Sequence, residues 1–298
     1  MKLKAHTLTL VVLIAIISIL TSCGSKTSKS KKWESLLDMN LSKWDKFVGV
    51  PHYSVKLDGY EKGDGTNGTP LGLNNDPLNV FSTVEMDGET VLKISGQIYG
   101  AVSTKKEYEN YHLRMMYKWG SGKYEPRADA PSDSGILYHC QEPQGAFWNC
   151  WMQSQEFQVQ NGDSGDYYTI AGTGMDIRSR KVVKPGAKFN IYIYDPKGEY
   201  KRFKSGEDGR CRKNTNYENP GVWNQLDLVC IGDKSYHIVN GNVAMVLERS
   251  VVYDKDDVAT SLTKGKIQLQ SEGAEVYYKD IEIRSVSKLP IEFFSLEN

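Results

Sequence analysis

An acid and two amides alternate along one short stretch of the chain, Gln155-Glu156-Phe157-Gln158-Val159-Gln160. If this stretch is a β-strand, Glu156, Gln158 and Gln160 point to one face of the sheet, and the two apolar side chains point to the other. A carboxyl group and two amides in a row form a polar wall of the kind that lines carbohydrate clefts. The alternative is the solvated outer face of an edge strand, and the stretch by itself does not decide between the two.

This strand offers one carboxylate to any reaction on its polar face. A glycosidase that retains configuration by direct displacement needs two carboxylates about 5 Å apart, one as nucleophile and one as acid. Gln158 and Gln160 occupy the positions where a second carboxylate would stand. The stretch therefore does not encode direct displacement of a glycosidic bond.

Other residues with suitable chemistry lie on either side of this stretch. His139 follows an apolar run and is a candidate acid or base, because imidazole titrates near neutral pH; the alternative is a structural hydrogen-bonding role beside tyrosines. Trp148 and Trp151 bracket Cys150 in a loop, and their rings suit stacking on sugars. Asp163 is expected near the mouth of the cleft, as a sugar ligand or as a solvated loop acid.

The elements that must position these residues are predicted to be strands. Residues 111–119 alternate apolar and mostly polar side chains, as in a half-buried antiparallel strand. Asn240-Gly241 separates two apolar runs and predicts a hairpin. Many short strands with turn residues between them predict an all-β fold, a β-sandwich or jelly roll of two antiparallel sheets with long loops around a concave face. Residues 120–134 and 195–221 are expected to be irregular loops.

The N-terminus has the pattern of a lipoprotein signal. Two early lysines and an apolar run over residues 8–20 precede Leu20-Thr21-Ser22-Cys23, and this run is shorter than the roughly 20 apolar residues of a transmembrane helix. We predict a signal peptide over residues 1–22, lipidation of Cys23, a flexible tether over 23–32, one domain over 33–288 and a tail over 289–298. The predicted location is a membrane-anchored lipoprotein that faces the periplasm or sits in the outer membrane. An ordinary signal peptide with Cys23 incidental is the alternative.

Composition and charge exclude some functions. The 298 residues include 39% hydrophobic and 25% charged side chains, with 37 basic and 37 acidic groups. A balanced charge argues against a nucleic-acid partner, which requires a concentrated basic face. Membrane contact is expected through the lipid anchor alone.

Four cysteines follow Cys23, at positions 140, 150, 211 and 230. Export permits disulfides, and the favoured pairing joins Cys140 to Cys150 and Cys211 to Cys230; free buried thiols are the alternative. Their spacing does not resemble a zinc site.

Several separated segments resemble, in order, the motifs of the 3-keto-disaccharide hydrolase family. Residues 35–44 resemble its opening "LFNGxxLxxW", residues 133–138 its "NSGIxxR" and residues 156–159 its "ExQI". Residues 222–224 with 237–241 are similar to its "EWN…HxxNG" pair, and residues 265–270 with 276–281 to its closing "GxIxLQ…VxFRNI". The resemblance covers Trp33 to Val286. Asp133 stands where the family usually has asparagine, His139 falls where an arginine is usual, and Asn161 stands where an aspartate often follows.

This resemblance implies a concanavalin A-like sandwich that cleaves glycosides whose sugar carries a 3-ketone. The ketone acidifies the hydrogen at C2, so that a single base can form an enolate, which expels the glycosidic oxygen from C1 before water adds. Such a reaction does not need two displacement carboxylates. The expected partner is therefore a carbohydrate.

The resemblance also suggests roles for particular residues. Glu156 is the expected base at C2, or else a ligand of a metal that polarises the ketone, and His237 stands at the histidine position of HxxNG. His237 has a structural hairpin role as its alternative. No cofactor is certain; a divalent metal ion held by Glu156, His139 and Asp163 is possible, although no tight ligand motif is present. Two other functions fit the same residues, a lectin-like module that binds glycans without cleaving them and a structural partner in a glycan-uptake complex.

Overall fold

The computed structural model describes residues 32–183, 186 and 190–296. The described residues belong to one compact unit, bounded at Lys31 and Asn298, that contains its own hydrophobic core and can be studied as a separate domain. The predicted signal peptide, Cys23 and the tether up to residue 31 lie outside the described residues, so these remain predictions. Within the described part of the chain, no helix has the length and apolar character needed to cross a membrane.

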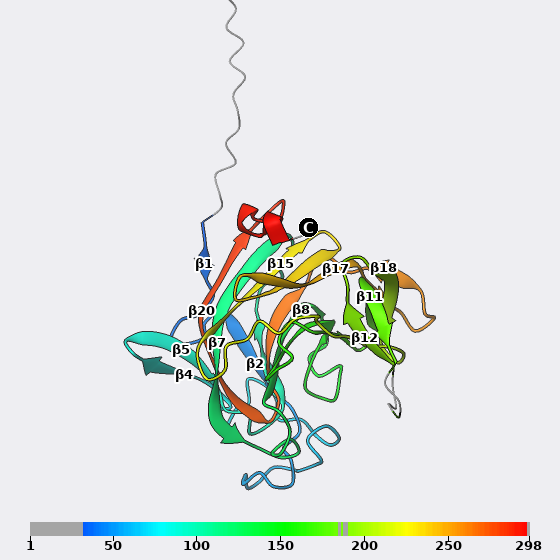
Figure 1. Cartoon of the computed structure of the whole chain (residues 1–298). Coiled ribbons are helices and arrows are strands. Elements are labelled where there is room, and N and C mark those ends of the chain that lie inside the picture. The colour runs from blue at the N-terminus through cyan, green and yellow to red at the C-terminus, as the bar shows by residue number, and fades with distance from the viewer. Residues whose placement is uncertain (1–31, 184–185, 187–189, 297–298) are drawn as a thin grey trace, which may run out of the picture. The chain divides into compact units, whose positions relative to one another are not determined.

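Two antiparallel sheets form the domain, as expected for a concanavalin A-like sandwich (Figure 1). The larger sheet has nine strands along its main path, in the order β12 (Ile191–Tyr194), β11 (Thr173–Val182), β17 (Asn242–Tyr253), β16 (Lys234–Val239), β15 (Asn224–Ile231), β7 (Tyr111–Lys123), β20 (Ala274–Ser285), β5 (Glu89–Ile94) and β4 (Phe81–Met86). Three further strands pair with β20, β11 and β17 respectively: β1 (Glu34–Ser35), β13 (Glu199–Lys204) and β18 (Ala259–Ser261).

The smaller sheet carries the polar strand singled out in the sequence. Its order is β14 (Arg210–Cys211), β10 (Tyr167–Ile170), β9 (Gln153–Gln160), β8 (Asp133–Gln141), β19 (Lys266–Ser271), β6 (Gly100–Thr104), β2 (Trp44–Val48) and β3 (Gly72–Leu73). Strand β9 therefore lies inside the sheet, between β8 and β10, and is not an edge strand.

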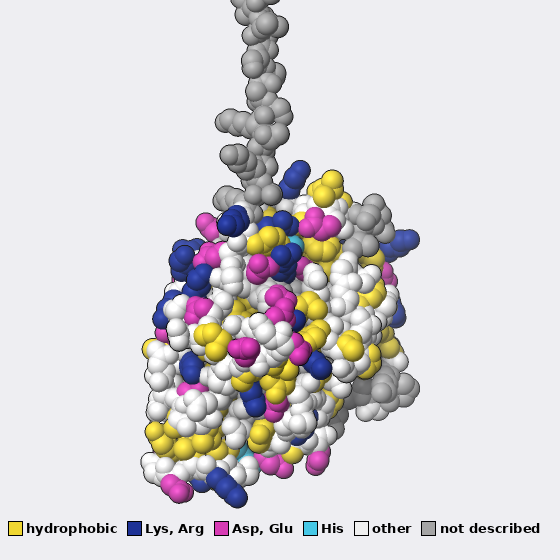
Figure 2. Space-filling view, turned by 90° about the vertical axis from the view of Figure 1, so that its left-hand side faces the viewer, with side chains coloured by type: hydrophobic (Ala, Val, Ile, Leu, Met, Phe, Trp, Pro, Cys, Tyr) yellow, Lys and Arg dark blue, Asp and Glu magenta, His cyan; other side chains and the backbone are white. Residues whose placement is uncertain are grey.

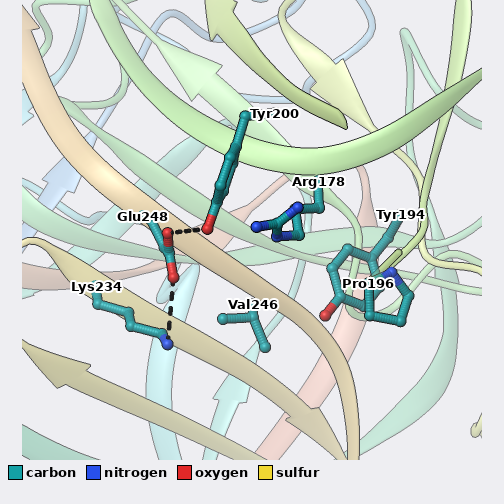
Figure 3. Close-up of a pocket in the computed structure, with 7 residues that line it drawn as sticks. All are labelled: Arg178, Tyr194, Pro196, Tyr200, Lys234, Val246 and Glu248. Atoms are coloured by element: carbon teal, nitrogen blue, oxygen red, sulfur yellow. Dashed lines mark hydrogen bonds and ion pairs between the residues drawn. The ribbon is translucent and has the colours of Figure 1, made fainter. Parts of the chain in front are cut away.

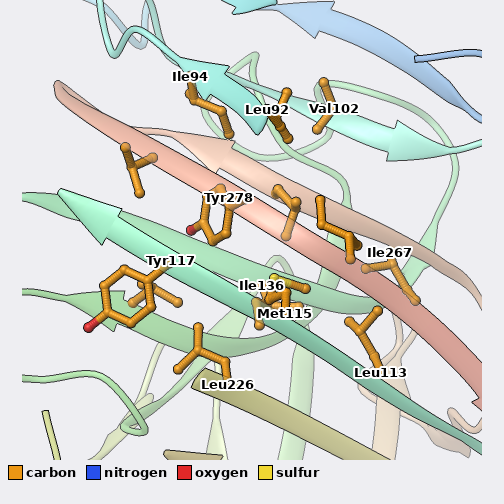
Figure 4. Packing of buried hydrophobic residues seen from close by; sticks show 14 of the residues in the cluster. Leu92, Ile94, Val102, Leu113, Met115, Tyr117, Ile136, Leu226, Ile267 and Tyr278 are labelled. Atoms are coloured by element: carbon orange, nitrogen blue, oxygen red, sulfur yellow. The ribbon is translucent and has the colours of Figure 1, made fainter. Parts of the chain in front are cut away.

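The core fills the space between the sheets because most of the inward side chains, at every second strand position, are apolar. Figure 4 shows Met115 and Tyr117 of the larger sheet packed with Ile136 and Ile267 of the smaller one, and all four side chains are buried. The alternation predicted over residues 111–119 is confirmed. On the outer surface shown in Figure 2, basic and acidic side chains are interspersed, as the balanced charge suggests.

The structure corrects the two predicted loops. Strand β7 continues to Lys123 and β8 begins at Asp133, so the first irregular segment is shorter than expected. The second contains β13, whose lysine and arginine residues hide its alternation, and β14, which is only two residues long. The hairpin at Asn240-Gly241 is confirmed: it joins β16 to β17, and its φ angles of 48° and 77° are those of a tight hairpin turn.

The C-terminal segment packs on the outer face of the larger sheet. It ends in a 3₁₀ helix, η1 (Ile291–Leu296), and the buried side chains of Leu289 and Phe293 pack against Tyr236 and Ile238 of β16. Apolar side chains on that outward face of β16 are thereby covered.

The four cysteines at positions 140, 150, 211 and 230 are free and buried. The favoured disulfide pairing is therefore wrong, and the alternative of free thiols is confirmed. Each of the four thiols packs in an apolar cluster instead of closing a loop.

Candidate active site

The outward face of the smaller sheet holds a row of buried polar side chains. Strands β8 and β9 pair so that Asp133 lies opposite Gln160, Gly135 opposite Gln158 and Leu137 opposite Glu156. Glu156 and Gln158 are buried on this face, whereas Phe157 and Val159 enter the core, as the sequence predicts. The alternative of a solvated edge strand is therefore excluded for Glu156.

Three carboxyl groups meet on this face. Glu156 on β9, Asp133 on β8 and Glu272, directly after β19, are 4%, 2% and 7% exposed. Loss of hydration disfavours the charged form of a buried acid, and a neighbouring negative charge disfavours it further. The three groups affect one another in this way: the charge of Asp133 raises the pKa values of both Glu156 and Glu272.

The surroundings separate the pKa values of these acids. Burial, with the charge of Asp133 adding to it, raises the pKa of Glu156 to about 8. Burial also raises the pKa of Asp133, to about 6, where the Arg127 guanidinium opposes the rise. Burial and the two other carboxylates raise the pKa of Glu272 well above its usual range. Near neutral pH, the cluster therefore contains an ionised Asp133 beside a protonated Glu156.

Arg127 is the cation of this cluster. Its Nη2 donates to Asp133 Oδ2, its Nη1 lies 3.8 Å from Glu272 Oε1, and Gln160 Nε2 also donates to Asp133 Oδ2. The buried Arg127 Nε has no hydrogen-bond partner in the part of the chain that the structure describes. A buried donor without a partner is costly, and an oxygen of a bound molecule would satisfy it.

Gly135 keeps space open beside the Glu156 carboxyl. A Cβ at this position would lie 2.6 Å from Glu156 Oε1 and 2.2 Å from Oε1 of Gln270, which is on β19. Any larger residue would therefore push the Glu156 carboxyl and the Gln270 amide away from their places. Lack of space beside the Glu156 carboxyl and the Gln270 amide thus explains why the Ser134-Gly135-Ile136 motif has glycine at its second position.

A cleft of about 590 Å³ lies at the β10–β14 edge of the same sheet. Tyr168 and Arg210 line it, and Tyr168 also pairs with Glu156 across β9 and β10. The Arg210 guanidinium lies 4.8 Å from the centre of the Tyr168 ring, and its Nη2 lies 2.6 Å from Asp166 Oδ2. A flat ring held beside a fixed cation is a suitable floor for a sugar.

The tryptophans predicted to stack on sugars differ in their surroundings. Trp151 is 2% exposed, donates from Nε1 to the carbonyl oxygen of Gly100 at 2.9 Å and stacks on Tyr99, so its ring belongs to the protein interior. The prediction of a sugar contact for Trp151 is therefore wrong. Trp148 is 48% exposed and stacks at 4.7 Å on Phe147, which lines the cleft.

Both candidate histidines lie away from the carboxyl cluster. His237 is buried between the sheets, stacked at 4.3 Å on Phe157, and burial lowers its pKa to about 3. His139 is buried beside Tyr111 and Tyr138, and burial lowers its pKa to about 4. Phe157 and Tyr111 belong to the core, on the opposite side of the smaller sheet from Glu156. The structure therefore does not support catalytic roles for the two histidines, and a structural role fits both.

The predicted metal ligands do not come together. His139 is in the core, and Asp163 accepts at 2.8 Å from Arg210 Nη2, so its carboxylate already has a cation of the protein as its partner. Among the described residues, no group of three or more histidine, cysteine, aspartate or glutamate side chains is placed to hold a metal ion. The set Glu156, His139 and Asp163 therefore does not fit a metal site.

Sequence reasoning missed Asp133, Glu272, Arg127, Arg210 and Phe147 as members of this region. One signal was available: Gln268, Gln270 and Glu272 alternate like the residues of β9, which predicts a second polar row on one face. Nothing in the spacing of Arg127 or Arg210 indicates their places, because their contacts with Glu272 and Asp166 join segments that are far apart along the chain.

The fold and the site define a β-sandwich protein with a buried acidic cluster on one sheet face. The chain belongs to the family of 3-keto-alpha-glucoside-1,2-lyase-like domains, whose model matches residues 32–284. This membership supports a carbohydrate-active function and an enzyme that acts on glycosides. A comparison with curated proteins gave no match.

Solved structures with similar folds share little sequence with this chain. A candidate glycosyl hydrolase from Parabacteroides distasonis is 19% identical, with 86% of this chain and 100% of that chain covered and a TM-score of 0.44. The β-glucanase of Bacillus licheniformis is 10% identical, with 87% and 99% covered and a TM-score of 0.38. The carbohydrate-binding module CBM66 from Bacillus subtilis is 7% identical, with 69% and 92% covered and a TM-score of 0.38.

Proposed function

We propose that this protein cleaves 3-keto-glycosides by removing the C2 proton, eliminating the glycosidic oxygen and hydrating the product. The observation that carries this proposal is the pair Asp133 and Glu156, two buried carboxyl groups on one sheet face whose pKa values lie at about 6 and about 8. Two acids with separated pKa values supply a base and an acid at the same pH. Membership of the 3-keto-alpha-glucoside-1,2-lyase-like family supplies the substrate class.

In this proposal, the ionised Asp133 is the base. It takes the proton from C2, and the electrons of the C–H bond form the C2–C3 double bond of an enolate. Arg127, which is bonded to Asp133, stabilises its negative charge before the reaction. The family usually has asparagine at this position, and an asparagine side chain could not accept the proton. The role of base at position 133 is therefore proposed for this chain and not for the whole family.

Glu156 then acts as the acid, not as the base that the sequence suggests. Its raised pKa keeps it protonated near neutral pH, so it donates a hydrogen bond to the developing C3 oxyanion. The enolate re-forms the ketone and expels the oxygen from C1, which takes up the proton that Asp133 removed from C2, so that Asp133 is ionised again. Water then adds across the C1–C2 double bond, with its oxygen at C1 and a proton at C2, and yields the free 3-keto sugar.

Incubation of residues 31–298 with a 3-keto-disaccharide and with its unoxidised parent tests this proposal. We expect sugar release from the ketone alone, with Asp133→Asn and Glu156→Gln each lowering kcat by about 10²-fold or more. Glu109→Gln, a matched change at an exposed glutamate, should leave the rate unchanged. Absence of release from both sugars would refute the hydrolase, and binding without release would favour the lectin-like alternative.

We also propose that Cys23 anchors the domain to a membrane as a periplasm-facing or outer-membrane lipoprotein. The basic, apolar and small-residue pattern before Cys23 supports this. Growth of expressing cells with an alkyne-tagged fatty acid should label the full chain, and Cys23→Ser should remove the label. Label that persists in Cys23→Ser would overturn the proposal.

A further inference from the structure

The outer face of the larger sheet has a hollow of about 320 Å³, formed by the seven residues labelled in Figure 3 and called here the outer hollow. They come from β11, β13, β16 and β17, from Tyr194 at the end of β12 and from Pro196 two residues beyond it. Arg178 follows the core residue Ile177 on β11 and therefore points away from the core. Glu156 is on the outward face of the other sheet, so the outer hollow and the carboxyl cluster lie on opposite sides of the sandwich.

Positive charge exceeds negative charge around the outer hollow. Asp176 Oδ1 accepts from Arg202 and its Oδ2 from Arg249, so a single carboxylate serves two guanidinium groups. Glu248 Oε1 lies 3.3 Å from Lys234 Nζ. Among the described residues, Arg178 forms no ion pair with a carboxylate. The total charge of the chain is balanced, but this local excess of positive charge creates an electrostatic potential that attracts anions.

Arg178 is held in a fixed position. Its guanidinium carbon lies 4.1 Å from the centre of the Tyr200 ring, and its Nη1 donates to the carbonyl oxygen of Gly198 at 3.1 Å. The Tyr200 hydroxyl in turn donates to Glu248 Oε2, which keeps the ring in place. A guanidinium has five N–H donors, and within the described part of the chain this one uses a single donor. The planar group can therefore offer two parallel N–H bonds to a carboxylate or sulfate.

The walls of the outer hollow fit a sugar ring. Tyr194 and Pro196 place two rings beside the Arg178 guanidinium, and Glu248 and Lys234 lie on the side facing them (Figure 3). An aromatic ring and the apolar surface of a proline pack against the C–H face of a sugar, and a carboxylate with an ammonium group binds its hydroxyls. The volume is at the lower end of the range of small-ligand sites, which begins at about 300 Å³.

We propose that the outer hollow is a second glycan-binding site that takes an acidic sugar unit, with its carboxylate or sulfate on Arg178. The site is independent of the proposed catalytic function. It would hold a charged polysaccharide on the protein while the carboxyl cluster, on the opposite side of the sandwich, cleaves its own substrate. A bilayer surface fits less well, because Arg178 is recessed and stacked instead of projecting.

Calorimetric titration of residues 31–298 with trigalacturonate and with neutral maltotriose tests this site. We expect binding of the acidic probe alone, and a loss of affinity of about tenfold or more in Arg178→Ala, since a hydrogen-bonded charge contributes that much. Arg180→Ala is the matched control: it removes the same charge from the same strand, at an exposed residue outside the outer hollow. Cleavage of a 3-keto-disaccharide should be unchanged in both variants.

Absence of trigalacturonate binding to the wild type would overturn the proposal. Equal losses in Arg178→Ala and Arg180→Ala would mean diffuse attraction, and equal binding of maltotriose would mean that the charge is not recognised. Arg178→Lys keeps the positive charge but lacks the planar guanidinium, so this variant should bind trigalacturonate more weakly than the wild type. Binding as tight as that of the wild type would refute the two parallel N–H bonds from Arg178. Tighter binding to phosphatidylglycerol vesicles than to trigalacturonate, through Arg178, would assign the hollow to a membrane. Thermal unfolding midpoints equal to the wild type would show that each variant is folded.

Discussion

Glu156→Gln should stabilise the domain at alkaline pH while it lowers activity. The pKa of the buried Glu156 is raised from 4.5 to about 8, so the folded state keeps a proton that the unfolded state loses between these values. Stability therefore falls by about 1.4 kcal/mol per pH unit over that window and levels off above it. The whole effect is at most about 5 kcal/mol. Glutamine is neutral at every pH and removes this loss.

Urea unfolding of residues 31–298 at several pH values between 4 and 9 measures the effect. The wild type and the matched control Glu109→Gln, at an exposed site, should lose stability together as the pH rises. Glu156→Gln should lose less, and the difference from the wild type should grow up to pH 8 and then stay constant. A Glu156→Gln protein with the same pH dependence as the wild type would refute a raised pKa at this residue.

Three further predictions concern the site, the thiols and the tail. The pH profile of kcat/KM should be a bell, rising near pH 6 as Asp133 ionises and falling near pH 8 as Glu156 loses its proton; Asp133→Asn should remove the acidic limb. Thiol titration of denatured, unreduced residues 31–298 should find four free thiols, and fewer would contradict the packing of the buried cysteines. Phe293→Ala should cost about 3 kcal/mol in urea unfolding by removing a buried ring from the cluster around Tyr236, and an unchanged midpoint would mean that the tail is not docked.

Much of the fold follows from local patterns. Alternation along residues 111–119 and 155–160 predicts which side chains enter the core, because successive strand residues point to opposite faces wherever the strand lies. The hairpin at Asn240-Gly241 is equally local, since it depends on two positive φ angles. Strand β13 escaped prediction because its basic residues mask the alternation, and β14 because two residues are too few to show one.

The site was predicted in part. The polar row of β9 could be predicted from the sequence. The catalytic roles predicted for His139 and His237 failed, because the presence of a histidine in a strand does not show which face of the sheet its ring will occupy. Both rings turn into the core, where burial keeps them neutral. The prediction that Trp151 stacks on a sugar failed for a related reason: its loop folds back on the sheet and buries the ring against Tyr99.

The sequence by itself determined the strand alternation, the polar face around Glu156 and the ordered motifs that resemble the family. The tertiary structure decided which acids work together: Asp133, Glu156 and Glu272 come from three strand segments and meet because β8 pairs with both β9 and β19. Burial then raises the pKa values of all three acids, and nearby carboxylates raise those of Glu156 and Glu272 further. These effects depend on distances through space, which the order of residues along a chain does not contain.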